Sequence, residues 1–331
     1  MATVTELKDL INSLSAEEKQ ELIYLLSKME SDDSDKLIAL QEARFSKGLF
    51  CPKCGSTSNI VRNGKYNGKQ RYLCKDCKAT FMCTQDTILH RTHKPLETWQ
   101  KYLDCMSSGM SIRKSAEVCN LSVPTAFYWR HKILDALRSK LENNRDKLAG
   151  IVESDETYFQ LSYKGQKRGL PRESRKRGGK ASKRGLSNEQ VCVVCGMDRQ
   201  GNIRFKASNL GKISAADLGK VYIGKVQDDA IFCTDSEKSY HKFARENGFR
   251  LIQIERGKHK QGIYHINHIN SYHSHLKNFV GKFKGVATKY LDNYLAWNLV
   301  KDKLIDRHFC DIVSQTVQIK NNEIKNRPLI R

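Results

Sequence analysis

The stretch VESDETYF, residues 152–159, combines the composition of a buried strand with three carboxylates. Its Val, Thr, Tyr and Phe residues favour a strand that enters a core, yet Glu153, Asp155 and Glu156 lie in the same run. Acidic residues are the scarcer charge in this chain, with 36 Asp and Glu against 58 Lys and Arg. Because burial makes an unpaired charge costly, these carboxylates indicate a site that binds a cation.

A second acid extends this pattern, because Asp235 ends the short apolar run AIFCTD at residues 230–235. If the two runs are neighbouring strands, as in a ribonuclease H-like sheet, Asp155 and Asp235 converge on one point. Two carboxylates at that spacing repel each other unless a divalent cation lies between them, and oxygen ligands favour Mg²⁺ or Mn²⁺. Two such ions can activate a water or a 3′-hydroxyl and stabilise the leaving oxygen of a phosphodiester.

A different kind of metal site is indicated by two C-x-x-C pairs that are separated by 19 residues: Cys51, Cys54, Cys74 and Cys77. Thiolates from two such pairs bind one zinc ion tetrahedrally. The residues between them suit a hairpin, with an Asn-Gly turn at 63–64 or at 67–68. The spacing therefore predicts a zinc ribbon over residues 46–85 with one structural Zn²⁺; unbound cytosolic thiols are the alternative.

Helical periodicity dominates the segments on both sides of the ribbon. Residues 1–45 are expected to form two amphipathic helices, the second opened by a capping box of Ser15 and Glu18. Residues 92–140 are predicted to hold two short helices, a tight turn, and a longer helix that has Ser122 as its N-cap and ends in the sequence WRHK. This order indicates a DNA-binding helix-turn-helix, with a helical connector as the alternative.

From residue 150 to residue 300 short apolar strands alternate with helices, which predicts an α/β domain with a mixed sheet. The expected strands are 151–159, 190–197, 201–208, 230–235 and 250–254, and the expected helices are 213–225, 237–247 and 266–280. The polar run at residues 161–185 is interpreted as a mobile basic loop that contacts DNA, or else as a solvated charge run. Residues 301–331 form a C-terminal tail.

The charge balance points to the same class of partner. A net charge of +22 requires a strongly negative partner, and double-stranded DNA is the first candidate because neutralising phosphates releases counterions. An anionic membrane surface is the rival, but no run approaches the roughly 18 apolar residues needed to span a bilayer. With no signal-peptide pattern at the start, we expect a cytoplasmic protein of the nucleoid whose eleven cysteines are thiols or zinc ligands.

The sequence resembles the bacterial insertion-sequence transposases that carry an N-terminal zinc ribbon ahead of an ISXO-like DDE catalytic domain. The resemblance covers about residues 45–300 and depends on five segments in the same order. They are the C-x-x-C pairs, VESDETYF, GLSNEQVCVVCGMD at 185–198, CTDSEKSYHKFA at 233–244 and HINSYHSHLKNFVGKFKGVATKYLDNYLAW at 268–297. It implies a ribonuclease H-like fold preceded by a zinc ribbon and a helix-turn-helix.

The resemblance also assigns roles to single residues. Asp155 and Asp235 match the first and second catalytic acids of the family, and the third position falls on Asn270, where many relatives have Glu and a subgroup has Asn. Lys277 matches a Lys that follows this position in the family. Seven residues are about two helical turns, so Asn270 and Lys277 share a helix face, one suited to a metal and the other to a phosphate. A simple helix cap is the alternative for Asn270.

Neighbouring residues are expected to take no part in this chemistry. Glu153 and Glu156, which flank Asp155, are expected to point to the opposite face of their strand. The histidines His265, His268, His273 and His275 are interpreted as surface or DNA-facing groups, and Cys192 and Cys195 as buried thiols. If Asn270 is not the third ligand, Glu255, His265 and His268 are the remaining candidates.

Together these features predict a DNA transposase. Such an enzyme binds the terminal inverted repeats of its element, cleaves them with Mg²⁺ or Mn²⁺, and joins the 3′-hydroxyls to target DNA. Because two DNA ends must be held, a homo-oligomer on DNA is expected. A structure-specific nuclease on the same fold and a transposase-derived DNA-binding regulator without catalysis are the alternatives.

Overall fold

A computed structural model of the chain describes the following residues: 12–15, 17–19, 33–66, 68–143, 146–166, 168–173, 182–183, 185–258, 260–301, 323–324 and 327–328. They divide into two compact units. Residues 1–110 and 114–122 belong to the first unit, and residues 123–304 belong to the second. Each unit is described by itself below.

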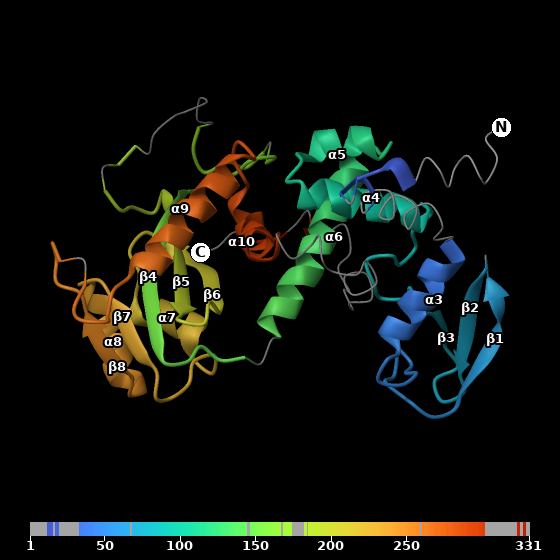
Figure 1. The fold of residues 1–331 in the computed structure, drawn as a ribbon, viewed down its shortest axis with the longest axis horizontal. Helices are drawn as coiled ribbons and strands as arrows, with labels where there is room; N and C mark the ends of the chain where they lie inside the picture. The colour runs from blue at the N-terminus through green and yellow to red at the C-terminus, as the bar shows by residue number, and fades with distance from the viewer. Residues whose placement is uncertain are drawn as a thin grey trace. The chain divides into compact units, whose positions relative to one another are not determined.

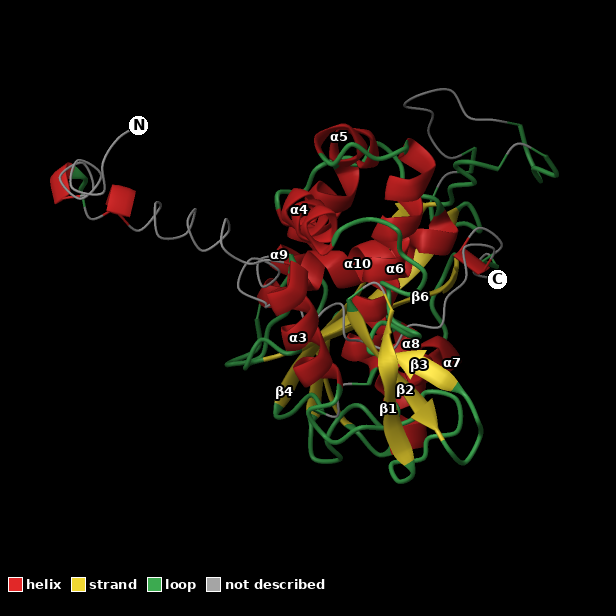
Figure 2. Ribbon diagram, turned by 90° about the vertical axis from the view of Figure 1, so that its right-hand side faces the viewer, coloured by secondary structure: helices red, strands yellow, loops and turns green. Residues whose placement is uncertain are grey.

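The first unit contains a small three-stranded sheet next to the helix α3 (Asp33–Arg44) (Figure 2). The strands β1 (Ile60–Tyr66), β2 (Lys69–Cys74) and β3 (Thr80–Met82) pair antiparallel in that order. Of the two candidate turns, the hairpin therefore uses 67–68, of which Gly68 is described and has a φ of 74°. The other Asn-Gly pair lies inside β1, where the register shifts between Arg62 and Lys65.

Ahead of these elements, the predicted capping box is present. The backbone N–H of Ser15 donates to Oε2 of Glu18 at 2.8 Å, and the N–H of Glu18 donates to Oγ of Ser15 at 3.2 Å. Most of the predicted N-terminal helical segment, residues 1–45, and most of the tail, residues 301–331, lie outside the described residues.

Three helices follow the ribbon, as the sequence predicts, but the third differs from the expectation. They are α4 (Leu96–Ser107), α5 (Ile112–Val118) and α6 (Val123–Glu142). Helix α6 continues ten residues beyond Lys132, so the sequence WRHK lies in its middle. Arg130 is fully buried in the second unit, where its guanidinium lies 4.9 Å from the ring centre of Trp297. These side chains stabilise the packing of α6 on α10 (Leu291–Val300). The helix-turn-helix function stays a prediction.

The second unit is built on a mixed sheet of five strands among the described residues, in the order β6-β5-β4-β7-β8. Their bounds are β4 (Ile151–Gln160), β5 (Gln190–Asp198), β6 (Ile203–Leu210), β7 (Ile231–Thr234) and β8 (Arg250–Gln253). The first three strands of the chain pair antiparallel, whereas β7 lies parallel to β4 and β8 parallel to β7. This is the ribonuclease H-like arrangement, with each strand within about two residues of its predicted place.

Helices cover both faces of this sheet (Figure 1). Helices α7 (Ala215–Tyr222) and α8 (Lys238–Asn247) pack on one face over a core that includes Val152 and Phe232. Helix α9 (Asn267–Gly281) runs along β4 on the other face. Cys192 and Cys195 are fully buried in β5, as expected for structural thiols. None of the described helices combines the length and the apolar composition needed to cross a membrane.

The described part of the basic run at residues 161–185 forms no helix or strand, and its first residues are tied to the domain. The Nζ of Lys164 donates to the carbonyl oxygens of Phe283, Lys284 and Gly285, the last at 2.7 Å. The N–H of Ser162 donates to Oγ1 of Thr288 at 2.9 Å. The residues that directly follow β4 are therefore hydrogen-bonded to the segment after α9, and the mobility of the run stays a prediction.

The close packing of Tyr222 on β5 yields a stability prediction. A methyl group at Gly196 would lie 2.6 Å from Cε1 of Tyr222, a residue that is itself fully buried. We expect Gly196→Ala to lower the free energy of unfolding by about 1–3 kcal/mol, as other overpacked cores do. Gly281→Ala is the matched control, because a methyl group there meets nothing within 4 Å. Chemical denaturation measures both, and equal stabilities would contradict the packing described here.

Candidate active site

The two predicted acids lie at the same level on neighbouring parallel strands. Glu153 of β4 pairs with Cys233 of β7, so Asp155 and Asp235 each follow two residues later. Carboxylate oxygens of Asp155, Asp235 and Glu156 all lie within 4.8 Å of one another. The structure therefore brings Asp155 and Asp235 together, and it adds a third carboxylate to them.

Glu156 corrects an expectation, because it does not point away from the acid pair. Strand β7 ends at Thr234, and its pairing with β4 reaches only as far as Glu153. Beyond that point no strand among the described residues pairs with β4 on this side, so side chains from both of its faces can reach the open edge. The alternation of a strand fixes the direction of Cβ, whereas a long Glu side chain at an edge can bend around it.

Electrostatics makes this cluster suited to a cation. Burial, together with the carboxylates of Asp155 and Asp235, raises the pKa of Glu156 to about 8. Burial also raises the pKa of Asp235, as does the neighbouring Asp155. Oε1 of Glu156 is buried and has no hydrogen-bond partner among the described residues. Several carboxylate oxygens, one of them unpartnered, fit the hard-oxygen shell of Mg²⁺ or Mn²⁺.

Helix α9 completes the site from the other side. Nδ1 of His273 lies 3.4 Å from Oδ2 of Asp155, and the His273 side chain is only 7% exposed. The interpretation of His273 as a surface group is therefore wrong. Asn270 lies one turn before His273 and Lys277 one turn after it, and both are exposed. Residues three or four apart are neighbours on a helix, so Asn270 and Lys277 flank the contact with Asp155.

The helix-cap alternative for Asn270 does not fit this geometry. The N-cap of α9 is Ile266, and the first helical residue is Asn267. Asn270 is therefore the fourth residue inside the helix, beyond the position at which a side chain caps the free N–H groups.

Glu153 also corrects an expectation, because it shares the α9 face of β4 with Asp155. Residues two apart on a strand point to the same side, and the Glu153 carboxylate contacts the start of α9. Its Oε1 lies 2.7 Å from Nδ1 of His268 and 2.7 Å from a guanidinium nitrogen of Arg199. His265 lies 3.4 Å from the same oxygen. The His268 side chain is nevertheless 56% exposed, as expected for a surface group, whereas that of His265 is 22% exposed.

The remaining candidates for a third metal ligand lie outside the carboxylate cluster of Asp155, Glu156 and Asp235. Glu255 is exposed and pairs with Lys258 at 2.7 Å. His265 and His268 belong to the Glu153 cluster rather than to the acids around Asp155. Among the described residues, Glu156 shares the carboxylate cluster with Asp155 and Asp235, and His273 of α9 contacts Asp155.

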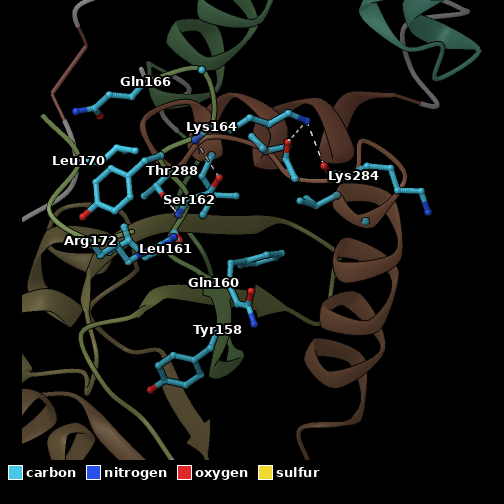
Figure 3. Close-up of a pocket in the computed structure, with 18 of the residues that line it drawn as sticks. Tyr158, Gln160, Leu161, Ser162, Lys164, Gln166, Leu170, Arg172, Lys284 and Thr288 are labelled. Carbon is cyan, nitrogen blue, oxygen red and sulfur yellow. Dashed lines mark hydrogen bonds between the residues drawn. The ribbon is translucent and has the colours of Figure 1, made fainter. Parts of the chain in front are cut away.

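A cavity of about 760 Å³ lies beyond the end of β4 and along the last turns of α9 (Figure 3). Its lining includes Lys277 and Lys284 from the helix side, and Arg172 and Tyr163 from the basic run. The guanidinium of Arg172 lies 5.6 Å from the ring centre of Tyr163. Cations next to aromatic rings are the side chains that bind phosphates and bases of nucleic acid.

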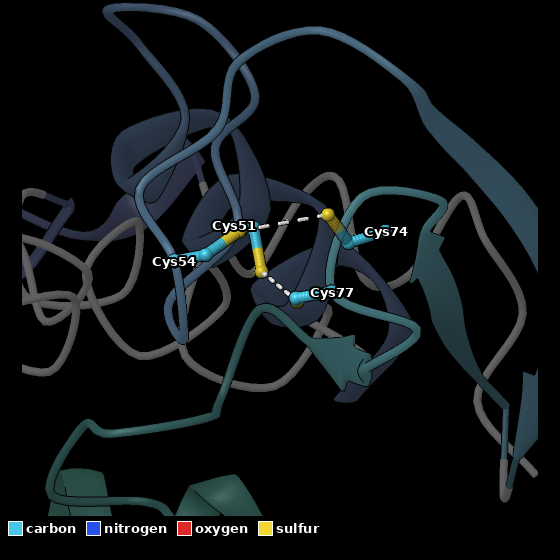
Figure 4. A group of neighbouring side chains, drawn as sticks. All are labelled: Cys51, Cys54, Cys74 and Cys77. Carbon is cyan, nitrogen blue, oxygen red and sulfur yellow. Dashed lines mark hydrogen bonds between the residues drawn. The ribbon is translucent and has the colours of Figure 1, made fainter.

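The four ribbon cysteines come together as predicted (Figure 4). Their sulfur atoms all lie within 4.8 Å of one another, with Cys51 Sγ 3.6 Å from Cys77 Sγ and Cys54 Sγ 3.7 Å from Cys74 Sγ. Tyr72 and Phe81 pack beside Cys51 and Cys74 and shield one side of the site. Four converging thiols are the donor set of a closed tetrahedral zinc site.

Two family models match the chain at the places where these sites lie. The ISXO2-like transposase domain matches residues 147–297, and the InsA N-terminal domain, a zinc ribbon, matches residues 46–78. Residues 147–297 are an ISXO2-like transposase domain. The predicted zinc ribbon is likewise confirmed, over residues 46–78, and its cysteines fit a structural zinc ion.

Three known proteins or complexes are similar to the chain to different degrees. The chain is 26% identical over 259 residues to an uncharacterized protein in transposable element ISH50 of Halobacterium salinarum, covering 77% of this chain and 86% of that protein. A pre-cleavage Mos1 transpososome aligns at 12% identity and a TM-score of 0.22, covering 91% of this chain and 98% of that one. Mos1 transposase in a paired-end complex with the left transposon end aligns at 12% identity and a TM-score of 0.22, covering 69% of this chain and 82% of that one. TM-scores this low do not establish shared geometry. The bacterial origin expected from the sequence stays a prediction.

Several residues of the transposase domain escaped the sequence analysis. Glu153 could have been found from strand alternation, because it lies two residues before Asp155. Glu156 could not, since its place depends on how far β7 extends. Arg199 carries no local signal, because it is a single residue in the turn between β5 and β6, 46 residues after Glu153.

The zinc ribbon predicts a metal content. The full chain should contain about one zinc ion, because four thiolates bind Zn²⁺ tightly enough to stabilise the fold around it. Replacing Cys51 and Cys74 by Ser should remove this zinc, whereas Cys105→Ala should retain it, since Cys105 is buried in α4. Elemental analysis after desalting decides the matter, and full zinc in the double variant would contradict the assignment.

The position of Asn270 predicts that its substitution lowers the cleavage rate while the melting temperature hardly changes. If its amide oxygen binds metal, Asn270→Ala should lower the cleavage rate about 10²-fold, roughly 2.7 kcal/mol of barrier, with little change in melting temperature. Asn278→Ala is the matched control, because Asn278 is exposed on the same helix. An unchanged rate for Asn270→Ala would remove it from the active site.

Proposed function

We propose that this chain is an active transposase that cleaves the ends of an insertion sequence and joins them to target DNA. The observation that carries the proposal is the cluster of Asp155, Glu156 and Asp235 at the open edge of β4 and β7. It lies inside a domain of the ISXO2-like transposase family. A metal site next to cationic surfaces suits phosphodiester chemistry.

In this proposal Asp155 and Asp235 hold one or two Mg²⁺ or Mn²⁺ ions, with Glu156 or Asn270 as a further ligand. When bound, these ions supply activation of a water or 3′-hydroxyl and stabilisation of the leaving oxygen. The His273 imidazole orients the Asp155 carboxylate. Lys277 contacts a phosphate next to the scissile one. The reaction is an in-line displacement at phosphorus without a covalent enzyme intermediate.

DNA approaches this edge through the basic surfaces of the chain. The net charge of +22 gives long-range attraction to phosphates. The exposed Lys277 and Lys284 beside the cavity, with the basic run at 161–185, supply contacts near the acids. The ribbon and the helices of residues 92–140 are proposed to recognise the terminal inverted repeats. Holding two ends requires at least a dimer on DNA, in the cytoplasm and on the nucleoid.

The acids predict the outcome of two substitutions. Asp155→Ala and Asp235→Ala should each abolish Mg²⁺-dependent cleavage, because a metal site that loses a carboxylate no longer neutralises the developing charge. Binding to the element's ends should be largely intact, since phosphate contacts come from the basic surface. Asp229→Ala is the matched control, because Asp229 is exposed just before β7. Cleavage by either site variant at the rate of the control would contradict the metal-site assignment.

The two alternative functions differ from transposition in their products. A nuclease on the same fold would cut but not join, and a DNA-binding regulator would do neither. Incubating the protein with end-labelled element DNA, Mg²⁺ and a supercoiled target separates the three. Covalent joining of labelled ends to the target is the expected result, and cutting alone would favour the nuclease.

A further inference from the structure

The start of α9 is held by a buried carboxylate from the middle of the sheet. Glu153 is 1% exposed, and its Oε2 accepts hydrogen bonds from the backbone N–H of His268 at 2.9 Å and of Ile269 at 3.1 Å. These are among the first N–H groups of the helix, which have no partner within the helix itself. A carboxylate at this end also complements the helix dipole.

The charge of this carboxylate is balanced by Arg199. One guanidinium nitrogen lies 2.7 Å from Oε1 of Glu153, 2.9 Å from Nε2 of His265 and 2.9 Å from Nδ1 of His268. The other donates to the carbonyl oxygen of Ile263 at 3.1 Å. One guanidinium therefore joins β4 to the segment before α9 and to its first turn. An ion pair with one buried partner, here the Glu153 carboxylate, needs such additional hydrogen bonds to offset the desolvation of that partner.

The turn that carries Arg199 is itself fixed. Asp198 is buried, and its carboxylate accepts hydrogen bonds from the backbone N–H of Gln200 and Asn202 at 3.0 and 2.9 Å. It also accepts from the side-chain amide of Asn202 at 2.9 Å. Arg199 is thus presented from a rigid turn between β5 and β6, which reduces the entropy lost when its guanidinium is held.

The three side chains around Arg199 have the composition of a metal site, but the guanidinium takes the place of the ion. Glu153, His265 and His268 offer ligand atoms within 4.8 Å of one another. Arg199 contacts all three with one nitrogen, so a metal ion would have to displace it. The cluster is therefore a hydrogen-bond and ion-pair network centred on the guanidinium of Arg199.

We propose that Glu153 is a positioning residue, whose carboxylate, held by Arg199, fixes the first turn of α9 beside the acid cluster. It lies two residues before Asp155 on the same face of β4. The N–H groups that it binds lie one and two residues before Asn270. A rotation or shift of α9 would therefore move Asn270 and His273 relative to Asp155. This inference rests on the proposed function for its effect on catalysis, but not for its effect on the helix.

The test compares three variants of the full chain. Glu153→Gln removes the charge at nearly constant volume, and Arg199→Met removes the guanidinium. Glu255→Gln is the matched control, because it makes the same change at a carboxylate whose side chain is 72% exposed. Each variant is measured by hydrogen–deuterium exchange without metal, and by the kcat and DNA KM of Mn²⁺-dependent cleavage per folded molecule.

We expect the amides of residues 267–270 to exchange about 10-fold faster in Glu153→Gln and in Arg199→Met, while those of β4 and β5 do not change. Cleavage kcat should fall about 10- to 100-fold with an unchanged DNA KM, the range typical of groups that orient metal ligands. The control should match the natural protein in both measurements. A merely structural role would lower the melting temperature and leave kcat per folded molecule unchanged.

Three outcomes would overturn the proposal: unchanged exchange in Glu153→Gln, unchanged kcat despite faster exchange, or a second zinc ion per chain that Glu153→Gln removes. The last would make the cluster a metal site. If the natural protein does not cleave DNA, the proposed function fails, and the exchange measurement still decides whether Glu153 holds α9.

Discussion

The fold of the second unit depends on one constraint, the placement of several negative charges in the central strand of a sheet. β5 pairs with β4 from Val152 to Gln160, whereas β7 pairs with it only from Ile151 to Glu153. Carboxylates at such a place have to be paired, hydrogen-bonded or open to a cation. The domain accommodates these carboxylates in different ways. Glu153 is paired with Arg199, whereas Asp155 and Glu156 lie where β7 has ended.

The early end of β7 is therefore as important as the acids themselves. A longer β7 would continue the pairing beside Asp155 and close the edge at which the three carboxylates meet. Instead the chain leaves the sheet at Asp235, and the N–H of Glu237 donates to Oδ1 of Asp235 at 3.0 Å. Helix α8 begins directly afterwards. The short strand thus places one acid at its end and opens the edge for two others.

Much of this arrangement could be predicted from the sequence, because the signals for it are local. The strands are short apolar runs bounded by polar residues; Asp155 lies within one such run and Asp235 ends another. The cysteine spacing of the ribbon is likewise local. What could not be predicted depends on how α9 is rotated about its axis and on where β7 ends. The burial of His273 depends on which face α9 turns to β4, and the role of Arg199 depends on a contact between distant residues.

Helix α9 shows how these long-range contacts combine, because β4 and its continuation hold it at both ends. Glu153 binds N–H groups at its start, and Lys164 binds carbonyl oxygens just beyond its end. Each charge has the sign that complements the helix dipole at that end. Fifteen helical residues span about 22 Å and the strand from Glu153 to Gln160 about 23 Å, so the two elements match in length. A helix held at both ends along a strand has little freedom to slide, so the face that α9 turns to Asp155 is set by Glu153 within β4 and by Lys164 just after it.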